Sequence, residues 1–167
     1  MAPHRDILGR YEDDLFGIPV VILNAVIKET DSRGNETITI PDEEGLAAAI
    51  AMARALCPIK LQADDIRMMR KTLGMKAKDF AGALGISPSR VSRMEKNTQG
   101  LGPFSEQAIR QFVCARLKRQ APAINYDPAE IATMEIVEGD VTAIEFERVR
   151  LKMAESQTKT DEWDLAA

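Results

Sequence analysis

The chain has 167 residues, of which 45% are hydrophobic and 29% charged, and its formal net charge at pH 7 is −4. This apolar content is enough for a buried core and excludes a disordered chain. His4 is the only histidine, and Cys57 and Cys114 are the only cysteines. We therefore expect no enzyme, metal site or cofactor, and two buried thiols in a reducing cytoplasm.

The charge is unevenly distributed along the chain. Residues 1–58 carry 5 basic and 10 acidic residues (net −5), residues 59–120 carry 13 and 5 (net +8), and residues 121–167 carry 4 and 11 (net −7). A basic segment between two acidic ones predicts a polyanionic partner for the middle segment alone. The alternative explanation is that the basic side chains of this segment form an ordinary solvated helix surface.

The N-terminal segment, residues 1–41, predicts a small β-hairpin unit. Residues 1–15 are polar without a clear period and are expected to be loosely held. Residues 20–28 are rich in β-branched side chains and residues 37–40 alternate, so both are predicted strands joined by a turn over 30–36. A two-stranded hairpin is marginal alone, so its apolar face must meet a helix or a second copy.

Residues 42–58 predict a linking helix, which Asp42 caps and which carries Leu46, Ile50 and Ala53 on one face. The basic segment, residues 59–120, follows it. In its first helix Ile66, Met69 and Leu73 are expected to face inward, and the cationic side chains to face outward: Arg67, Arg70 and Lys71.

Residues 74–96 have the pattern of a helix-turn-helix. Ala81 is small where two helices cross, Gly85 supplies a turn position that tolerates positive φ, and Val91 supplies an apolar plug from the second helix. Ser87 and Pro88 are typical of the N-cap and first position of that second helix. Its outer face is polar and cationic, as a helix that enters a DNA groove requires.

These residues resemble the Cro/repressor (XRE-type) helix-turn-helix family over residues 61–118. The polar pair that usually opens the family's first motif helix is replaced here by Lys76-Ala77. We expect base reading by Ser89, Arg90 and Arg93. Contacts to the DNA backbone are expected from Lys76, Lys78, Ser87, Ser92, Lys96 and Asn97.

The chain after the motif predicts further helices. A helix opens with Ser105 as N-cap and Phe104 stapled to Ile109, and part of its apolar face is a candidate dimer seam. Residues 121–167 predict an acidic extension that either pads the core or docks on a partner or second protomer. It contains a helix over 128–138, a strand or helix over 141–153, and disorder from about 157.

The layout also resembles the MqsA type of antitoxin and its YgiT-type zinc-finger relatives. Their zinc-binding CxxC falls on Thr30 and Arg33, so no zinc site is expected here. The Asn and Arg that read bases in that family fall on Ser89 and Arg93. The resemblance implies a repressor paired with a co-encoded toxin.

We predict a mainly α (α+β), cytoplasmic, homodimeric and sequence-specific DNA-binding repressor of an inverted-repeat operator. An antitoxin of a type II pair that represses its own operon is the favoured role. Two alternatives stay open: a phage- or plasmid-type regulator without a toxin, and a toxin-neutralising interaction module with little DNA binding.

Overall fold

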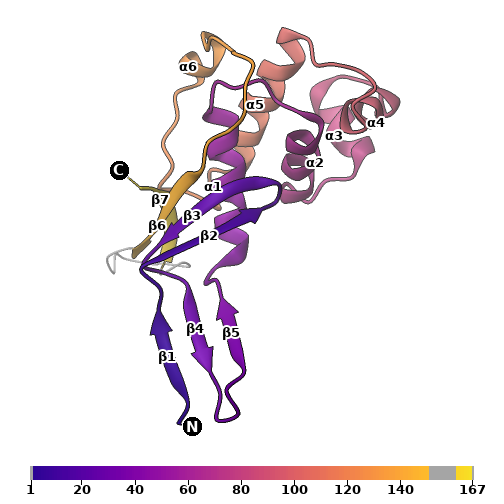
Figure 1. Ribbon diagram of the computed structural model, residues 1–167. Helices are drawn as coiled ribbons and strands as arrows, with labels where there is room; N and C mark the ends of the chain where they lie inside the picture. The colour runs from indigo at the N-terminus through magenta and orange to yellow at the C-terminus, as the bar shows by residue number, and fades with distance from the viewer. Residues whose placement is uncertain (1, 151–160, 167) are drawn as a thin grey trace.

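The computed structural model describes residues 2–150 and 161–166. It contains six helices and two sheets, which confirms the predicted α+β class (Figure 1). The helices are α1 (Glu43–Leu56), α2 (Ala63–Thr72), α3 (Ala77–Leu84), α4 (Pro88–Glu95), α5 (Pro103–Leu117) and α6 (Pro128–Ala132). The strands are β1 (His4–Ile7), β2 (Arg10–Leu15), β3 (Ile18–Leu23), β4 (Ile27–Thr30), β5 (Glu36–Thr39), β6 (Ile144–Arg150) and β7 (Asp161–Leu165).

The first four strands form one long antiparallel ribbon, so the expectation of a loosely held segment over 1–15 is wrong. Strands β2 and β3 meet at a two-residue turn in which Phe16 and Gly17 both have positive φ, the conformation that tight hairpin turns require. Strand β1 continues the ribbon by pairing with β4.

A bulge divides the ribbon and explains why the predicted strand over 20–28 is two strands. Three residues, 24–26, lie opposite two, 8–9, and Asn24 takes a φ of 52°. The bulge sends β3 into one sheet and β4 into another. Strand β4 still forms the predicted hairpin with β5, and the Asp31 carboxylate stabilises its turn by accepting bonds from the backbone of Arg33 and Asn35.

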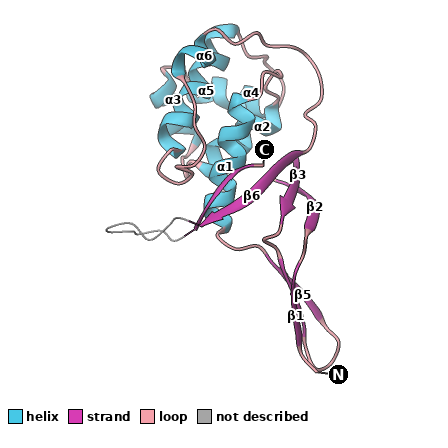
Figure 2. Ribbon diagram, turned by 90° about the vertical axis from the view of Figure 1, so that its left-hand side faces the viewer, coloured by secondary structure: helices cyan, strands magenta, loops and turns pink. Residues whose placement is uncertain are grey.

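The two sheets differ in their surroundings. The sheet β1-β4-β5 projects from the body of the molecule, and its strands are exposed or half-buried (Figure 2). The sheet β2-β3-β6-β7 buries one face through Ile18, Val20, Ile22 and Phe146. Strand β6 runs parallel to β3, so the C-terminal part of the chain completes a sheet begun near the N-terminus.

The acidic C-terminal extension is therefore part of the core. Of the stretch expected to be disordered, residues 157–160 lie outside the described residues, but residues 161–165 form β7. Trp163 is 1% exposed, and its indole N–H donates to the Asp42 carbonyl at 3.1 Å. In the ambiguous stretch 141–153, residues 144–150 are strand, and 151–153 are not among the described residues.

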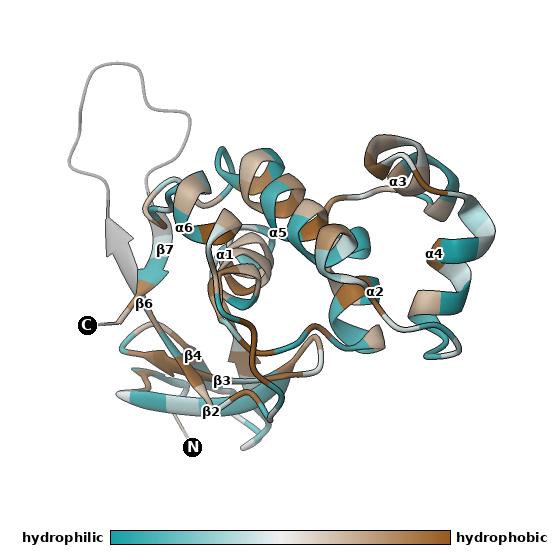
Figure 3. Cartoon of the chain, turned by 90° about the horizontal axis from the view of Figure 1, so that it is seen from above, coloured by the Kyte–Doolittle hydropathy of each residue, from teal (hydrophilic) through white to brown (hydrophobic). Residues whose placement is uncertain are grey.

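Helix α1 lies at the centre of the molecule between the strands and α5 (Figure 3). Asp42 caps it as predicted, and its carboxylate accepts a bond from the Gly45 N–H. Residues 48–55 are all buried, which is typical of a helix surrounded by a core. The helix thus joins the sheets to the basic segment through packing as well as through the chain.

The structure corrects two details of the predicted helices and one of the predicted thiols. Helix α5 begins at Pro103 with Gly102 as its cap, and Phe104 is 88% exposed, so there is no staple to Ile109. Three apolar residues of the candidate dimer seam on α5 are buried in the core of this chain, Ile109, Val113 and Leu117, whereas Phe112 is half-buried. Helix α6 ends at Ala132, because Val137 pairs with Ile59 in an extended bridge. Cys57 is only half-buried.

Cys114 does match the expectation of a buried thiol. Burial raises its pKa to about 12, so the thiol stays protonated at physiological pH. Among the described residues, no helix has both the length and the apolar character needed to cross a membrane.

Candidate nucleic-acid interface

Helices α3 and α4 form the predicted helix-turn-helix. Ala81 and Val91 are fully buried where the helices meet, and Gly85 ends α3 with a φ of 70°. The Ser87 hydroxyl accepts a bond from the Arg90 N–H, and Pro88 is the first residue of α4. Local capping and a tight turn therefore set the start of α4.

The C-terminal end of α4 is tied to α2 by two arginines. The Arg70 guanidinium binds both carboxylate oxygens of Glu95, at 2.5 and 3.2 Å, and Arg67 donates to the Glu95 carbonyl. Arg70 also donates to the Met75 carbonyl before α3. The expectation that Arg70 faces outward is wrong, because its guanidinium is bound to Glu95. This two-point bond to a carboxylate orients α4 against α2.

The exposed face of α4 carries two of the residues expected to contact DNA. Ser89 and Arg93 lie two positions before and after the buried Val91, so they project from the opposite face of the helix. Both are exposed, and the Arg93 Nε donates to the Gln99 side chain at 2.8 Å. This contact links the guanidinium to the loop that follows α4.

Arg90 is placed differently from Ser89 and Arg93. It is half-buried and donates to the Ser105 hydroxyl at 3.1 Å, so its side chain turns toward the start of α5. Ser87 is exposed, and its hydroxyl already serves as the cap of α4. Ser92 is half-buried at the side of the helix.

The four remaining candidates for contacts to the DNA backbone lie at the start of α3 and directly after α4. Lys76 caps α3, and Lys78 lies in its first turn. Lys96 and Asn97 follow the end of α4, where Asn97 takes a φ of 58° and its N–H donates to the Met94 carbonyl. All four side chains are exposed, as contacts to phosphates require.

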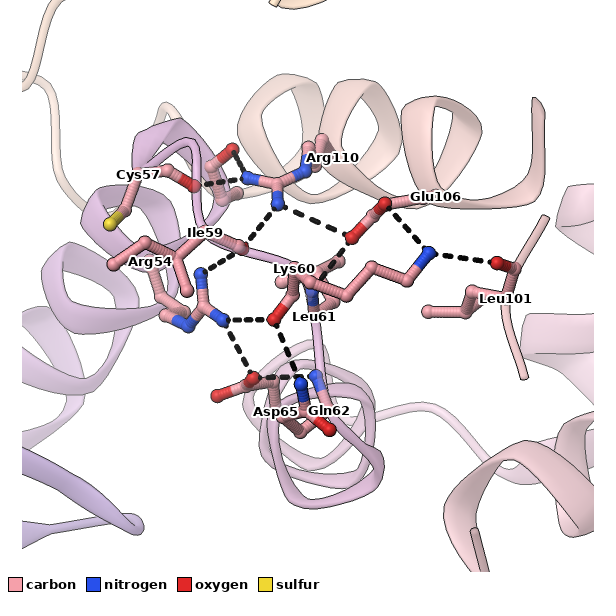
Figure 4. A network of polar contacts seen from close by, with 11 residues as sticks. Arg54, Cys57, Ile59, Lys60, Leu61, Gln62, Asp65, Leu101, Glu106 and Arg110 are labelled. Carbon is pink, nitrogen blue, oxygen red and sulfur yellow. Dashed lines mark hydrogen bonds and ion pairs between the residues drawn. The ribbon is translucent and has the colours of Figure 1, made fainter. Parts of the chain in front are cut away.

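A buried polar network that the sequence analysis missed joins this domain to α1 (Figure 4). Arg110 of α5 donates to the carbonyls of Ala55, Cys57 and Ile59, and Arg54 of α1 donates to those of Ile59 and Lys60. Both arginines are 1% exposed. Arg110 thus provides a partner for carbonyls at the end of α1, and Arg54 for carbonyls of the connector that follows.

Two carboxylates complete this network. Asp65 pairs with Arg54 at 2.9 Å and caps α2 by accepting the Gln62 N–H. Glu106 accepts the Leu61 N–H at 2.6 Å and pairs with Arg110 and Lys60. The network therefore fixes the connector between α1 and α2 against α5.

A family model described as helix-turn-helix matches residues 66–103, from within α2 to the first residue of α5. This segment is a helix-turn-helix domain of the Cro/repressor type, as predicted. The presence of this domain supports the assignment of the protein as a DNA-binding transcription regulator. No curated protein and no solved structure matches the chain, and the resemblance to the MqsA type of antitoxin stays a prediction.

Proposed function

We propose that this protein is a sequence-specific repressor that inserts α4 into the major groove of an operator. The observation that carries the proposal is the exposed face of α4, with Ser89 and Arg93 opposite the buried Val91. Arg93 donates bidentately to guanine in this arrangement, and Ser89 contacts a neighbouring base. Arg90 is left out of the base-reading set because it is held by Ser105.

Phosphate contacts are assigned to the exposed residues on either side of α4: Lys76, Lys78, Lys96 and Asn97. They lie at the start of α3 and after the end of α4, which are the segments nearest the DNA backbone when a second motif helix enters the groove. The net charge of +8 over residues 59–120 supports a polyanionic partner for this segment.

The affinity for DNA is expected to fall steeply with salt. Three lysines that each neutralise one phosphate give a log–log slope of about −3 per protomer, because each releases about 0.9 counterion. Fluorescence anisotropy with a duplex over a range of NaCl concentrations measures the slope. Lys78→Ala should lower its magnitude by about one, whereas Arg33→Ala, on the remote β4–β5 turn, should leave it unchanged. A wild-type slope near zero would refute the phosphate contacts.

The proposed operator is an inverted repeat bound by a homodimer. One domain of this size covers one half-site, and a two-fold dimer places its recognition helices about one helical turn apart. Ile109, Val113 and Leu117 of α5 are buried within the chain, so a dimer seam on α5 would have to use the exposed Phe104 and the half-buried Phe112. The expected symmetry of the operator is tested by the selection experiment in the Discussion.

An acidic sheet face supports the further proposal of a basic protein partner, such as a co-encoded toxin. The sheet face opposite the buried Phe146 carries Glu12, Glu145 and Glu147. Asp164 on β7 lies directly across from Glu147 on β6 and so shares this face. Arg10 is paired with Glu12 and Glu145, so it only partly offsets the negative charge.

Co-expression with the product of the adjacent gene tests this second role. We expect a complex by size-exclusion chromatography that is lost in the double variant Glu145→Lys, Glu147→Lys, because the acidic face is then reversed in part. Glu130→Lys on α6 is the control and should retain the complex. The antitoxin role would be contradicted if the wild-type chain formed no complex, or if the double variant formed the complex as well as wild type does.

A further inference from the structure

A hollow of about 300 Å³ lies between α5 and the segment that follows α6. One side is a single face of α5, formed by Pro103, Glu106, Gln107 and Arg110, and Lys60 of the α1–α2 connector also lines it. Its volume is at the lower end of the range for small-molecule sites. None of the residues of α4 lines it, so the hollow is separate from the proposed recognition face.

The floor of the hollow belongs to a buried cluster with an excess of positive charge. Arg54, Arg110 and Lys60 are balanced by only two carboxylates, Asp65 and Glu106, which leaves a net charge of +1. Burial lowers the pKa of Arg110, the carboxylate of Glu106 raises it in part, and the nearby charge of Arg54 lowers it again. An added anion at this floor would be favoured because it offsets like-charge repulsion in a region of low dielectric constant.

One donor at the floor is accessible to such an anion, the ammonium of Lys60, and a second donor, the Arg110 Nε, is buried nearby. The Lys60 ammonium has three N–H groups and uses two, toward the Leu101 carbonyl at 2.8 Å and Glu106 at 3.3 Å. The Arg110 Nε is buried and has no hydrogen-bond partner among the described residues. A buried donor without a partner costs stability, so an acceptor delivered to it is stabilising.

The opposite wall is mainly apolar. Ile131 is buried, Met134 is half-buried and Ile136 is 36% exposed, and all three line the hollow. Glu138 adds one exposed carboxylate at this wall. A site with cationic donors on one side and aliphatic side chains on the other matches an amphipathic anion.

We propose that this hollow is an effector site for a small carboxylate with a short hydrocarbon body. The carboxylate accepts from Lys60 near the buried charge of Arg110, and the hydrocarbon packs on Ile131 and Ile136. The regulatory part of this inference rests on the proposed DNA-binding function, whereas the binding of the carboxylate does not.

The route from the hollow to the DNA interface runs through Lys60. Its ammonium holds the Leu101 carbonyl in the loop between α4 and α5, and the same loop begins with Lys96 and Asn97. A carboxylate that draws Lys60 away from Leu101 removes a restraint on that loop. Binding of a carboxylate in the hollow therefore lowers the affinity of the protein for DNA.

Isothermal titration calorimetry with the full chain tests the site directly, with hexanoate as the probe and hexylammonium as its charge-reversed counterpart. Hexanoate should bind, and hexylammonium should not. Gln107→Trp fills the hollow from α5 and should weaken hexanoate binding at least about tenfold, as should Lys60→Met. Ala108→Trp, on an exposed neighbouring position of α5, should bind as wild type does. Glu138→Gln should bind more tightly, because it removes a competing negative charge.

Several results would overturn the proposal. These are no heat of binding with hexanoate, equal binding of the two probes, or equal affinity in wild type and a Gln107→Trp variant that melts as wild type does. The effector role is tested by the affinity for a specific duplex with saturating hexanoate, compared with the same concentration of acetate. A fall is expected, and no change would overturn the regulation. A chain that binds hexanoate but no DNA at all would refute the proposed function and leave the site intact.

Discussion

Replacing Arg110 with methionine should destabilise the protein by about 3–5 kcal/mol, because the substitution removes one partner of a buried charged network. Arg110 is 1% exposed and donates to three backbone carbonyls, of Ala55, Cys57 and Ile59, and to Glu106. Methionine fills much of the volume but donates nothing. The three carbonyls then stay buried with fewer partners, and Glu106 loses a countercharge.

Thermal and urea denaturation monitored by circular dichroism measure this loss. For a chain of this size the melting temperature should fall by about 6–20 °C. Arg119→Met, at an exposed position just after α5, is the control and should change the free energy of unfolding by less than about 0.5 kcal/mol. Equal effects of the two substitutions would mean that the network does not hold α1 and its connector against α5.

Replacing Arg93 with alanine should flatten the discrimination between cognate and scrambled DNA by about 1–3 kcal/mol. This is the contribution of one bidentate contact between arginine and guanine. Arg93 is exposed on the face of α4 opposite Val91, and its side chain donates to the nearby Gln99. The substitution should therefore leave the fold unchanged.

Lys96→Ala supplies the matched comparison, because Lys96 lies just beyond α4 and is assigned to a phosphate. This variant should weaken binding to cognate and scrambled duplexes by similar factors, and it should lower the magnitude of the salt slope by about one. Fluorescence anisotropy with both duplexes measures the two effects. If Arg93→Ala costs the same on both duplexes, then Arg93 is a backbone contact and the assigned recognition face is wrong.

The helix-turn-helix could be predicted from the sequence because its determinants are local. The small Ala81, the Gly85 turn and the Ser87-Pro88 start of α4 lie within a few residues of one another, and each acts through the backbone of its neighbours. The cap of α1 at Asp42 and the turn between β4 and β5 could be predicted for the same reason.

The features that were missed depend on contacts between distant segments. Strand β7 is short and acidic, and nothing in its own residues indicates that Trp163 packs beside Asp42, 121 positions earlier. The bulge at Asn24 becomes evident only once the opposing residues of the ribbon are known. Arg54 and Arg110 were missed because the carbonyls that they bind come from the connector between α1 and α2, and a helix pattern does not show this.

Selection of DNA from a random-sequence pool by the full chain tests whether this protein is a sequence-specific regulator. We expect enrichment of an inverted repeat whose halves lie about one helical turn apart and contain a guanine that Arg93 reads. The same selection with Arg93→Ala should lose the preference at that guanine while keeping the spacing of the halves. A pool that shows no enriched motif after selection by the wild-type chain would contradict the assignment of this protein as a sequence-specific regulator.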